Sequence, residues 1–305
     1  MWMQSPGGWR VRHPQLRGHT LGGFAYSHRV FVTDQFVLDR RFGCDGGPGT
    51  AREYTRSVGR TYTTEAVVLR SFRFGEADRV LHLYTADRGR VGAVAKGVRK
   101  TKSRFGGRLE PLSHVELVLR QGSGELATVT GCSLIRPHSA AREDSYRLAA
   151  GLIGLEAMLR LYPEQERNER AFTALTRFLD ALDGIGSRAP ARPALDPLAL
   201  AFQLKLLWLS GYLPHLESCV ECGATEGLVG FLPKAGGAVC RACGGEGGAV
   251  ALSPEGLRGI AALLHAPLAE AHDAGLTDRG ARDALAVISA SYEHSGGFRL
   301  RTLTA

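Results

Sequence analysis

Four cysteines, arranged as two C-x2-C pairs, constrain the fold of this chain more than any other feature. Cys219 pairs with Cys222 and Cys240 with Cys243, and seventeen residues separate the two pairs. Two pairs at this separation can place four thiolates at the corners of a tetrahedron, the geometry that Zn2+ adopts in proteins. The pattern therefore predicts one zinc ion per chain. Because all four ligands are protein thiolates, no position remains for water or substrate, and the zinc is expected to be structural.

Two disulfides or four free thiols are the alternative interpretations of the same cysteines. Structural disulfides are typical of exported proteins. The first residues, Met1 to Arg17, contain several arginines but no apolar core of a signal peptide. No apolar run approaches the ~20 residues that span a bilayer. We therefore expect a cytoplasmic protein with reduced cysteines and no association with a membrane.

The 305 residues divide into three parts of different character. Residues 1–59 carry clusters of glycine and proline around one short apolar stretch, without sustained periodicity. We expect this part to be either a disordered extension or the product of a misassigned start. Residues 60–138 are rich in β-forming segments, and residues 139–305 have helical patterns. The expected fold class is therefore α+β, with more than one domain.

Short β-rich segments separated by turns occupy residues 60–138. Ala86-Asp87-Arg88-Gly89 is one of the clearest turns, and alternation of apolar and polar residues is strong on both sides of it. Five strands with this alternation predict a small closed β-barrel, and five is the strand count of an OB-fold. The expected strands are Thr64–Arg70, Arg79–Tyr84, Arg90–Ala95, His114–Leu119 and Leu126–Thr130.

Residues 139–305 are expected to form an all-helical domain, because apolar residues recur there at helical spacing. Asp196 and Ser253, each followed by proline, are expected to begin two of its helices. The cysteines lie between these two helices in residues 216–247, a glycine-rich segment too small to bury a core. We expect this segment to be an inserted zinc module that the metal stabilises, with the flanking helices packed together.

Positive charge is concentrated in the region of the predicted barrel. The chain carries a net charge of +8, and residues 60–120 hold thirteen Lys and Arg against six Asp and Glu. Between Asp87 and Glu110 there are eight cations and no acid, which favours a polyanionic partner over a solubilising loop. The candidate nucleic-acid-binding residues are Arg88, Arg90, Lys96, Arg99, Lys100, Lys102, Arg104, Phe105 and Arg108.

Aromatic residues lie among these arginines. OB barrels bind single strands by stacking bases on aromatic side chains beside a cationic groove. The candidates for stacking are Phe72, Phe74, Tyr84 and Phe105. At least half of them are expected in the barrel core, since alternation sends every second side chain inward. Phe105 precedes two glycines in a predicted loop, so it is the one expected to be exposed.

Two stretches of the chain carry long motifs. The first contains TEAVVL at residues 64–69 and FGEADRVL at residues 74–81, followed by KGVR at residues 96–99. The second is FQLKLLWLSGYLP at residues 202–214, which leads into the first cysteine pair. Both closely resemble the bacterial recombination mediator family RecO. The resemblance covers about residues 60–243 in the family's order, and it does not include residues 1–59. It implies an N-terminal OB-fold, a helical domain and, as in many members, a zinc module held by four cysteines.

The resemblance also implies a function. Proteins similar to this family bind single- and double-stranded DNA and anneal complementary single strands. With the partner RecR, they help to load RecA onto DNA coated with the single-strand-binding protein SSB, in gap and break repair, and they contact the acidic C-terminal tail of SSB. By position, the basic segment from Arg88 to Arg108 corresponds to the DNA-binding side of the barrel. A protein of this kind is expected to be nucleoid-associated.

The SSB tail is acidic with an apolar tip, so it requires an apolar groove with cations at its rim. Amphipathic helices provide such grooves, and the helical part has cations beside leucine-rich faces, namely Arg160, Arg177 and Lys205. We expect the tail to bind between helices within residues 140–215 or 252–294, away from the DNA site. The alternative interpretation is that these three cations are solvated surface residues that bind no partner.

No enzymatic activity is expected, because the chain lacks a Walker A motif, a G-x-S-x-G motif and an H-E-x-x-H motif. Glu76 and Asp78 are too few carboxylates for a two-metal nuclease, and we expect them in a turn, paired with Arg73 and Arg79. The competing interpretation of the whole chain is a zinc-ribbon and OB-fold RNA-binding protein of transcription or translation, because composition does not distinguish DNA from RNA.

Overall fold

The computed structural model describes residues 60–303, apart from residues 101, 104, 186–191 and 245–247. The expectation for residues 1–59, a disordered extension or a misassigned start, therefore lies outside the described residues. No helix among the described residues combines the length and the apolar character needed to cross a bilayer.

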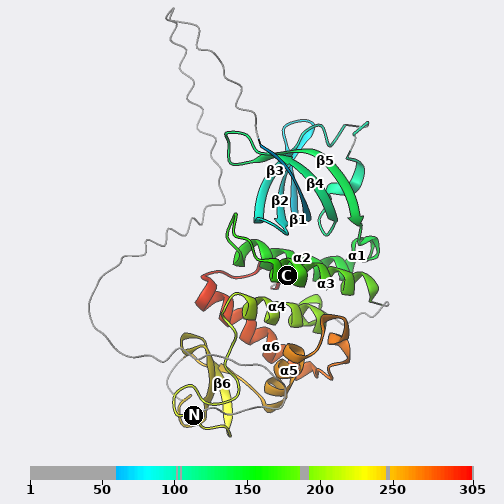
Figure 1. The fold of residues 1–305 in the computed structure, drawn as a ribbon. Coiled ribbons are helices and arrows are strands. Elements are labelled where there is room, and N and C mark those ends of the chain that lie inside the picture. Colours follow the sequence, from blue (N-terminus) through cyan, green and yellow to red (C-terminus); the bar gives the residue numbers. More distant parts are fainter. Residues whose placement is uncertain (1–59, 101, 104, 186–191, 245–247, 304–305) are drawn as a thin grey trace, which may run out of the picture. The chain divides into compact units, whose positions relative to one another are not determined.

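Five strands form a closed barrel in the order β1-β2-β3-β5-β4 (Figure 1). The strands are β1 (Thr61–Phe74), β2 (Asp78–Thr85), β3 (Gly89–Ala95), β4 (His114–Arg120) and β5 (Ala127–Arg136). Neighbouring strands are antiparallel except β3 and β5, which pair in parallel at Ala93 and Val94 and close the barrel. The five strands predicted from sequence alternation are confirmed.

Alternate side chains of the strands fill the interior of the barrel. In β3, Val91, Ala93 and Ala95 are buried, whereas the residues between them are half-exposed. Phe105 belongs to this core and is only 2% exposed, so the expectation that it is an exposed stacking residue is wrong. The connection between β3 and β4 folds over the end of the barrel and ends in a 3-10 turn whose Leu109 is buried in the same core. The two glycines after Phe105 thus belong to a loop that inserts an aromatic ring into the barrel.

Among the described residues, six α-helices follow the barrel. They are α1 (Ser139–Glu143), α2 (Ser145–Leu161), α3 (Glu169–Gly184), α4 (Pro197–Leu209), α5 (Pro254–His265) and α6 (Asp278–Ser291). The predicted start of α4 is confirmed, because the Asp196 side chain accepts hydrogen bonds from the backbone N–H groups of Leu198 and Ala199. Ser253 caps α5 in the same manner. Helices α4 and α5, which flank the cysteine segment, are in contact as expected.

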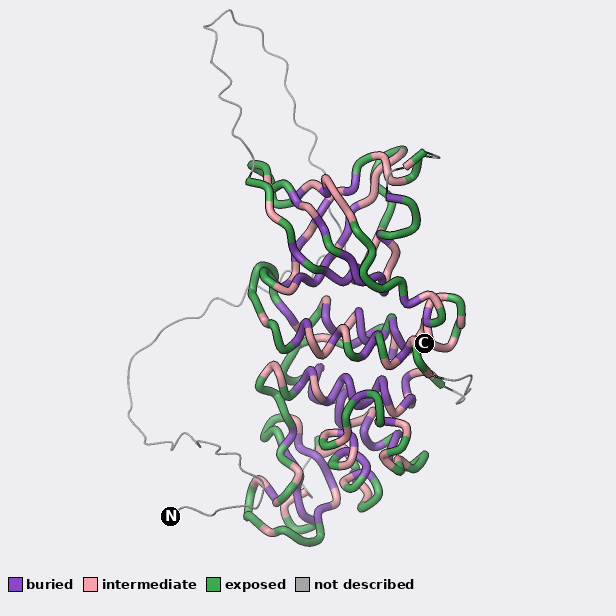
Figure 2. Tube along the Cα trace, turned by 45° about the vertical axis from the view of Figure 1, so that its right-hand side comes forward, coloured by how far each residue is buried: buried purple, intermediate pink, exposed green. Residues whose placement is uncertain are grey.

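The helices and one outer face of the barrel share a single hydrophobic core. Phe202 of α4 stacks on Phe178 of α3, with ring centroids 4.2 Å apart. Val67, Leu69 and Tyr84 belong to the barrel strands, yet their side chains are buried in this helical core rather than in the barrel interior. Helix α2 contacts β1 directly (Figure 1), and buried residues occur both in the barrel and along the helices (Figure 2).

Between α4 and α5 lies a three-stranded sheet of order β7-β6-β8. Its strands are β6 (Leu228–Leu232), β7 (Gly237–Cys240) and β8 (Val250–Ala251). The expectation that this segment buries no core is wrong. Leu228, Leu232 and Val239 form a small cluster with the cysteines, and Phe231 is buried in the main helical core. The sheet is thereby fixed to the helices, and the C-terminal part of the chain is not purely helical.

Candidate metal centre and nucleic-acid interface

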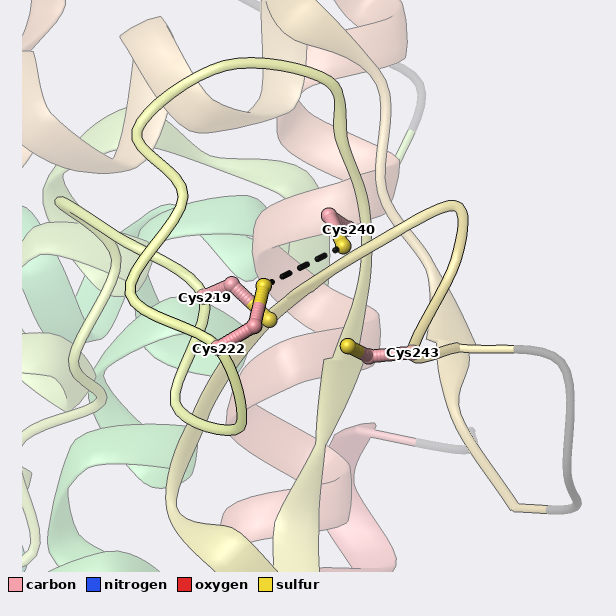
Figure 3. A group of neighbouring side chains, drawn as sticks. All are labelled: Cys219, Cys222, Cys240 and Cys243. Carbon is pink, nitrogen blue, oxygen red and sulfur yellow. Dashed lines mark hydrogen bonds between the residues drawn. The ribbon is translucent and has the colours of Figure 1, made fainter.

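The four cysteines of the two C-x2-C pairs converge on one point. The Sγ atoms of Cys219, Cys222, Cys240 and Cys243 all lie within 4.8 Å of one another (Figure 3). Those of Cys222 and Cys240 are 3.7 Å apart. A regular tetrahedron with Zn–S distances of about 2.3 Å has S···S edges of about 3.8 Å. All four are free thiols, which excludes the disulfide interpretation. The donor set therefore fits a tetrahedrally coordinated metal ion.

Two similar turns present the thiols. The N–H of Gly223 donates to the carbonyl oxygen of Cys219, and the N–H of Gly244 donates to that of Cys240, both at 2.8 Å. Gly223 has a φ of +77°, a left-handed conformation that favours glycine. The first turn follows α4, and the second turn ends β7, so the fold brings the two sequence pairs together.

The first turn packs closely on β7. The N–H of Val220 donates to the carbonyl oxygen of Ala238 at 2.9 Å, and the N–H of Ala238 donates to that of His215 at 2.7 Å. A Cβ atom at Gly237 would overlap the Val220 side chain. Glycine at this position thus permits the contact that holds the two cysteine turns at their separation.

The electrostatics of the cluster favour a cation. Hydrogen bonds from the backbone of Cys240 and Cys222 lower the pKa of the Cys219 thiol to about 6. Hydrogen bonds to the neighbouring thiols, that to Cys222 first, raise the pKa of Cys243 to about 12. The backbone thus stabilises a thiolate at Cys219, whereas the neighbouring thiols favour the protonated form of Cys243. A divalent cation at their centre would favour the thiolate form of all four.

The basic run between Asp87 and Glu110 does not form one continuous strip, because β3 divides it. Arg88 lies in the β2–β3 turn, whereas Lys96, Arg99 and Lys100 follow the other end of β3. All four are exposed. Lys102 and Arg108 are exposed as well, and Arg104 lies outside the described residues. The structure thus places these cations at two opposite ends of the barrel.

Arg90 forms contacts within the protein, between the barrel and the helical part. Its Nη1 donates to the carbonyl oxygen of Leu159, and its Nη2 lies 3.4 Å from Oε1 of Glu164. The N–H of Gln165 donates to the carbonyl oxygen of Arg90 at 2.9 Å. The side chain of Arg90 therefore binds the last turn of α2 and Glu164 after it, and its backbone binds Gln165. The assignment of Arg90 as a DNA-binding residue is not supported by this geometry, since its guanidinium is committed to these contacts.

The loop that follows β3 contacts the turn between β1 and β2. Nη1 of Arg99 donates to the carbonyl oxygen of Glu76 at 2.8 Å, and the N–H of Gly97 donates to Oδ1 of Asp78 at 2.7 Å. The expected pairing of Asp78 with Arg79 is wrong, because Arg79 instead forms a salt bridge of 2.8 Å with Glu110. The two acids of the turn thus position the loop after β3.

Two exposed aromatic rings lie on β1 next to this turn. Phe72 is 39% exposed and Phe74 is 49% exposed, whereas Tyr84 and Phe105 are buried. Phe72 and Phe74 are two positions apart in β1, so both rings lie on one face of the strand. The alternation of the sequence in β1 could therefore have identified Phe72 and Phe74, instead of Phe105, as the exposed rings. We refer to Phe72, Phe74, Lys96, Arg99 and Lys100 together as the Phe74 surface.

A separate cleft of about 1450 Å³ lies in the helical part. Helices α3 and α4 and the segment after α5 line it. Its apolar wall includes Trp208, which is 55% exposed, and its cations include Arg177 and Lys205. The Nζ of Lys205 donates to the carbonyl oxygen of Leu264 at 2.9 Å, and burial lowers its pKa. Arg160, the third cation considered from sequence, is not among the residues that line the cleft.

Comparison with known proteins matches nearly all of the described residues. A family model described as "Recombination protein O N terminal" matches residues 60–138, and one described as "Recombination protein O C terminal" matches residues 142–304. The DNA repair protein RecO of Rubrobacter xylanophilus is 39% identical over 231 residues, which cover 73% of this chain and 87% of the relative. The protein of the same name from Anaeromyxobacter sp. strain K is 36% identical over 238 residues, or 77% of this chain and 91% of the relative.

Proposed function

The chain belongs to the RecO family of DNA repair proteins, and from this premise we propose that it is a DNA-binding recombination mediator. It binds single- and double-stranded DNA and anneals complementary single strands. With RecR, it assists the loading of RecA onto SSB-coated DNA at the nucleoid. Neutralising phosphates on two strands lowers their mutual repulsion, so annealing requires no bond chemistry. The protein acts as a binding protein and not as an enzyme.

In this proposal the barrel is assigned to the OB-fold. Five strands, closure through β3 and β5, and a loop that covers one end with Phe105 and Leu109 support this assignment. OB-folds bind single strands through exposed aromatic rings beside cations. Phe72 and Phe74 are exposed at the end of β1, and this position supports the assignment.

The Phe74 surface is the observation that carries the DNA-binding proposal. Two rings on one face of β1 stack on bases, and each stacked base contributes ~1–3 kcal/mol. The exposed ammonium groups of Lys96 and Lys100 and the guanidinium of Arg99 contact phosphates. Because Arg99 is held by the carbonyl oxygen of Glu76, its charge is positioned before DNA arrives.

Removal of three charges tests the proposal. The variant K96A/R99A/K100A should bind single-stranded DNA more weakly, and the slope of log affinity against log salt should fall by about 0.7 for each lost phosphate contact. The matched control is K234A/R258A/R282A, which removes three exposed cations outside the barrel. Fluorescence anisotropy with a labelled oligonucleotide measures both quantities. An unchanged slope in the first variant would place the DNA site elsewhere.

The same assay addresses the RNA-binding alternative. Family membership favours DNA, and annealing of SSB-coated complementary DNA strands is the activity that a transcription or translation module lacks. If an RNA oligonucleotide binds more tightly than DNA of the same sequence and SSB-coated strands fail to anneal, the alternative is correct.

We assign Zn2+ to the four cysteines as a structural ion. Tetrahedral thiolate ligation is the usual structural zinc site, and the N–H donors of the two turns stabilise the thiolates. When bound, the ion supplies a cross-link between the turn that follows α4 and the end of β7. No open coordination position remains for a reaction.

The cleft beside Trp208 is proposed as the site for the acidic SSB tail. The wall accepts the apolar end of the peptide, and Arg177 pairs with its carboxylates. The full chain should bind a labelled tail peptide, R177E should weaken binding, and the control R282E should leave it unchanged. The peptide should not displace a short oligonucleotide. If K96A/R99A/K100A abolishes peptide binding while R177E has no effect, the tail binds the barrel instead.

A further inference from the structure

A second group of arginines lies at the end of the barrel opposite the Phe74 surface. Arg60 precedes β1, Arg88 lies in the β2–β3 turn, and Arg120 ends β4. All three are exposed. We refer to these residues and Tyr62 together as the Tyr62 surface. None of the four except Arg88 was singled out by the basic run in the sequence.

Strand register brings these residues together. Thr61 of β1 pairs with Arg120 of β4, and the N–H of Gln121 donates to the carbonyl oxygen of Arg60 at 3.0 Å. The Cζ atom of Arg88 lies 4.1 Å from the centre of the Tyr62 ring. Arg88 thus contacts the ring, while Arg60 and Arg120, from two other stretches of the chain, lie at the same end of the barrel.

The stacking of Arg88 on Tyr62 gives this surface a definite chemistry. A guanidinium is planar, forms paired hydrogen bonds with phosphate and stacks on rings. The ring of Tyr62 holds it in place on one side. The acid nearest to Arg88 in the sequence is Asp87, whose Oδ2 accepts a hydrogen bond from the Thr64 hydroxyl at 3.0 Å. The surface therefore suits a phosphate backbone and a stacked base.

The two surfaces are distant along the barrel. The seven residues of β3 separate the turn that holds Arg88 from the loop that begins at Lys96. At about 3.3 Å per residue, this strand spans about 23 Å. A single short oligonucleotide would have to follow the wall of the barrel to contact both surfaces.

Acidic side chains interrupt that wall on two sides. Beside β3, the segment after α2 covers the surface through Glu164, which binds Arg90, and through Glu166, whose backbone touches Gly89. On the other side, Glu65 of β1 and Glu116 of β4 are directly opposite each other, and both are exposed. Both routes would bring phosphates next to carboxylates, which is unfavourable.

We propose that the Tyr62 surface is a second nucleic-acid site, which binds the phosphates and a base of one single strand while the Phe74 surface binds another. The inference rests on the proposed DNA-binding function and specifies how one chain engages two strands. Two strands held on one barrel have a raised effective concentration for each other. Annealing would then proceed within one complex.

Oligonucleotide stoichiometry tests the inference in the full chain. Native mass spectrometry with a short oligothymidylate at saturation should show two oligonucleotides per wild-type chain. The variant R60A/R88A/R120A should bind one and lose annealing of complementary strands. K96A/R99A/K100A should also bind one, whereas K234A/R258A/R282A should bind two and anneal normally. R88K keeps the charge but lacks the planar group. It should still bind two oligonucleotides, with a lower affinity at the Tyr62 surface.

Different failures have different meanings. If the wild-type chain binds no oligonucleotide, the proposed function itself is wrong. If it binds a single oligonucleotide and R60A/R88A/R120A anneals at the wild-type rate, the second site does not exist and the proposed function stands. A single bound oligonucleotide whose affinity falls in both barrel variants would show one continuous path, and it would also overturn the two-site inference.

Discussion

Phe105 and Phe74 illustrate how position in the barrel decides what a phenylalanine does. The ring of Phe105 is in the core, whereas that of Phe74 is half-exposed. We predict that F105A lowers the free energy of unfolding by ~3–5 kcal/mol, the usual cost of removing a buried aromatic ring. F74A should change stability little and weaken single-strand binding by ~1–3 kcal/mol. Chemical denaturation and oligonucleotide titration of both variants measure the four quantities.

Each variant serves as the control for the other. A stable F105A protein that binds DNA weakly would mean that the loop after β3 presents this ring to solvent when DNA is bound. An F74A protein with unchanged affinity would remove the stacking part of the proposed interface and leave only its charges.

A prediction for the metal centre follows from the exposed Cys222 thiol. C222S removes one of four ligands, so the zinc content should fall and the melting temperature should decrease by at least ~2–4 °C, which corresponds to about 1 kcal/mol in a protein of this size. The control is C132S, at a free thiol outside the cluster. Metal analysis and thermal unfolding give the result. Purified wild-type protein without zinc that melts unchanged in a chelator would contradict the assignment.

At the scale of elements, the contact between the β2–β3 turn and the segment after α2 depends on glycine. Gly89 and Gly75 both have left-handed backbones, with φ of +63° and +57°. A Cβ at Gly89 would overlap the carbonyl group of Glu166, whereas none of the described atoms lies within 4 Å of a Cβ at Gly75. We predict that both G89A and G75A show the backbone cost of ~1–2 kcal/mol, and that G89A is destabilised further by ~1–3 kcal/mol.

Urea denaturation of the two variants isolates the effect of the contact, because the backbone conformation is matched. Equal destabilisation of G89A and G75A would show that the segment after α2 moves away at little cost. The barrel and the helices would then be less firmly joined than the bonds of Arg90 indicate.

The sequence predicted those elements whose signals are local. Alternation identified the five strands, Asp196 followed by proline identified the start of α4, and the cysteine spacing identified the cluster of four thiols. The roles of Arg90 and Tyr84 could not be predicted in this way, because both depend on residues at or just after the end of α2, about 70 to 80 positions later in the chain. The division of the basic run likewise follows from the length of β3 and from barrel closure, which pair residues remote in sequence.

At the scale of the whole molecule, the shared core predicts cooperative unfolding of the barrel and the helices. Tyr84 of β2 and Tyr162 after α2 are in edge contact, with centroids 5.5 Å apart. Hydrogen exchange followed by mass spectrometry in increasing denaturant should show amides of β2 and α4 exchanging through the same opening. If β2 becomes labile at a lower denaturant concentration than α4, the barrel unfolds separately.

The burial of Tyr84, Val67 and Leu69 under the helices also matters while the ribosome makes the protein. The barrel strands end at Arg136, but α2, which contacts β1, ends only at Leu161, roughly 25 residues later. At ~5–20 residues per second, a nascent barrel waits about 1–5 s before its outer apolar face is covered. During that interval the nascent chain offers a binding site to chaperones, and a slow codon between these two positions would lengthen its exposure to aggregation.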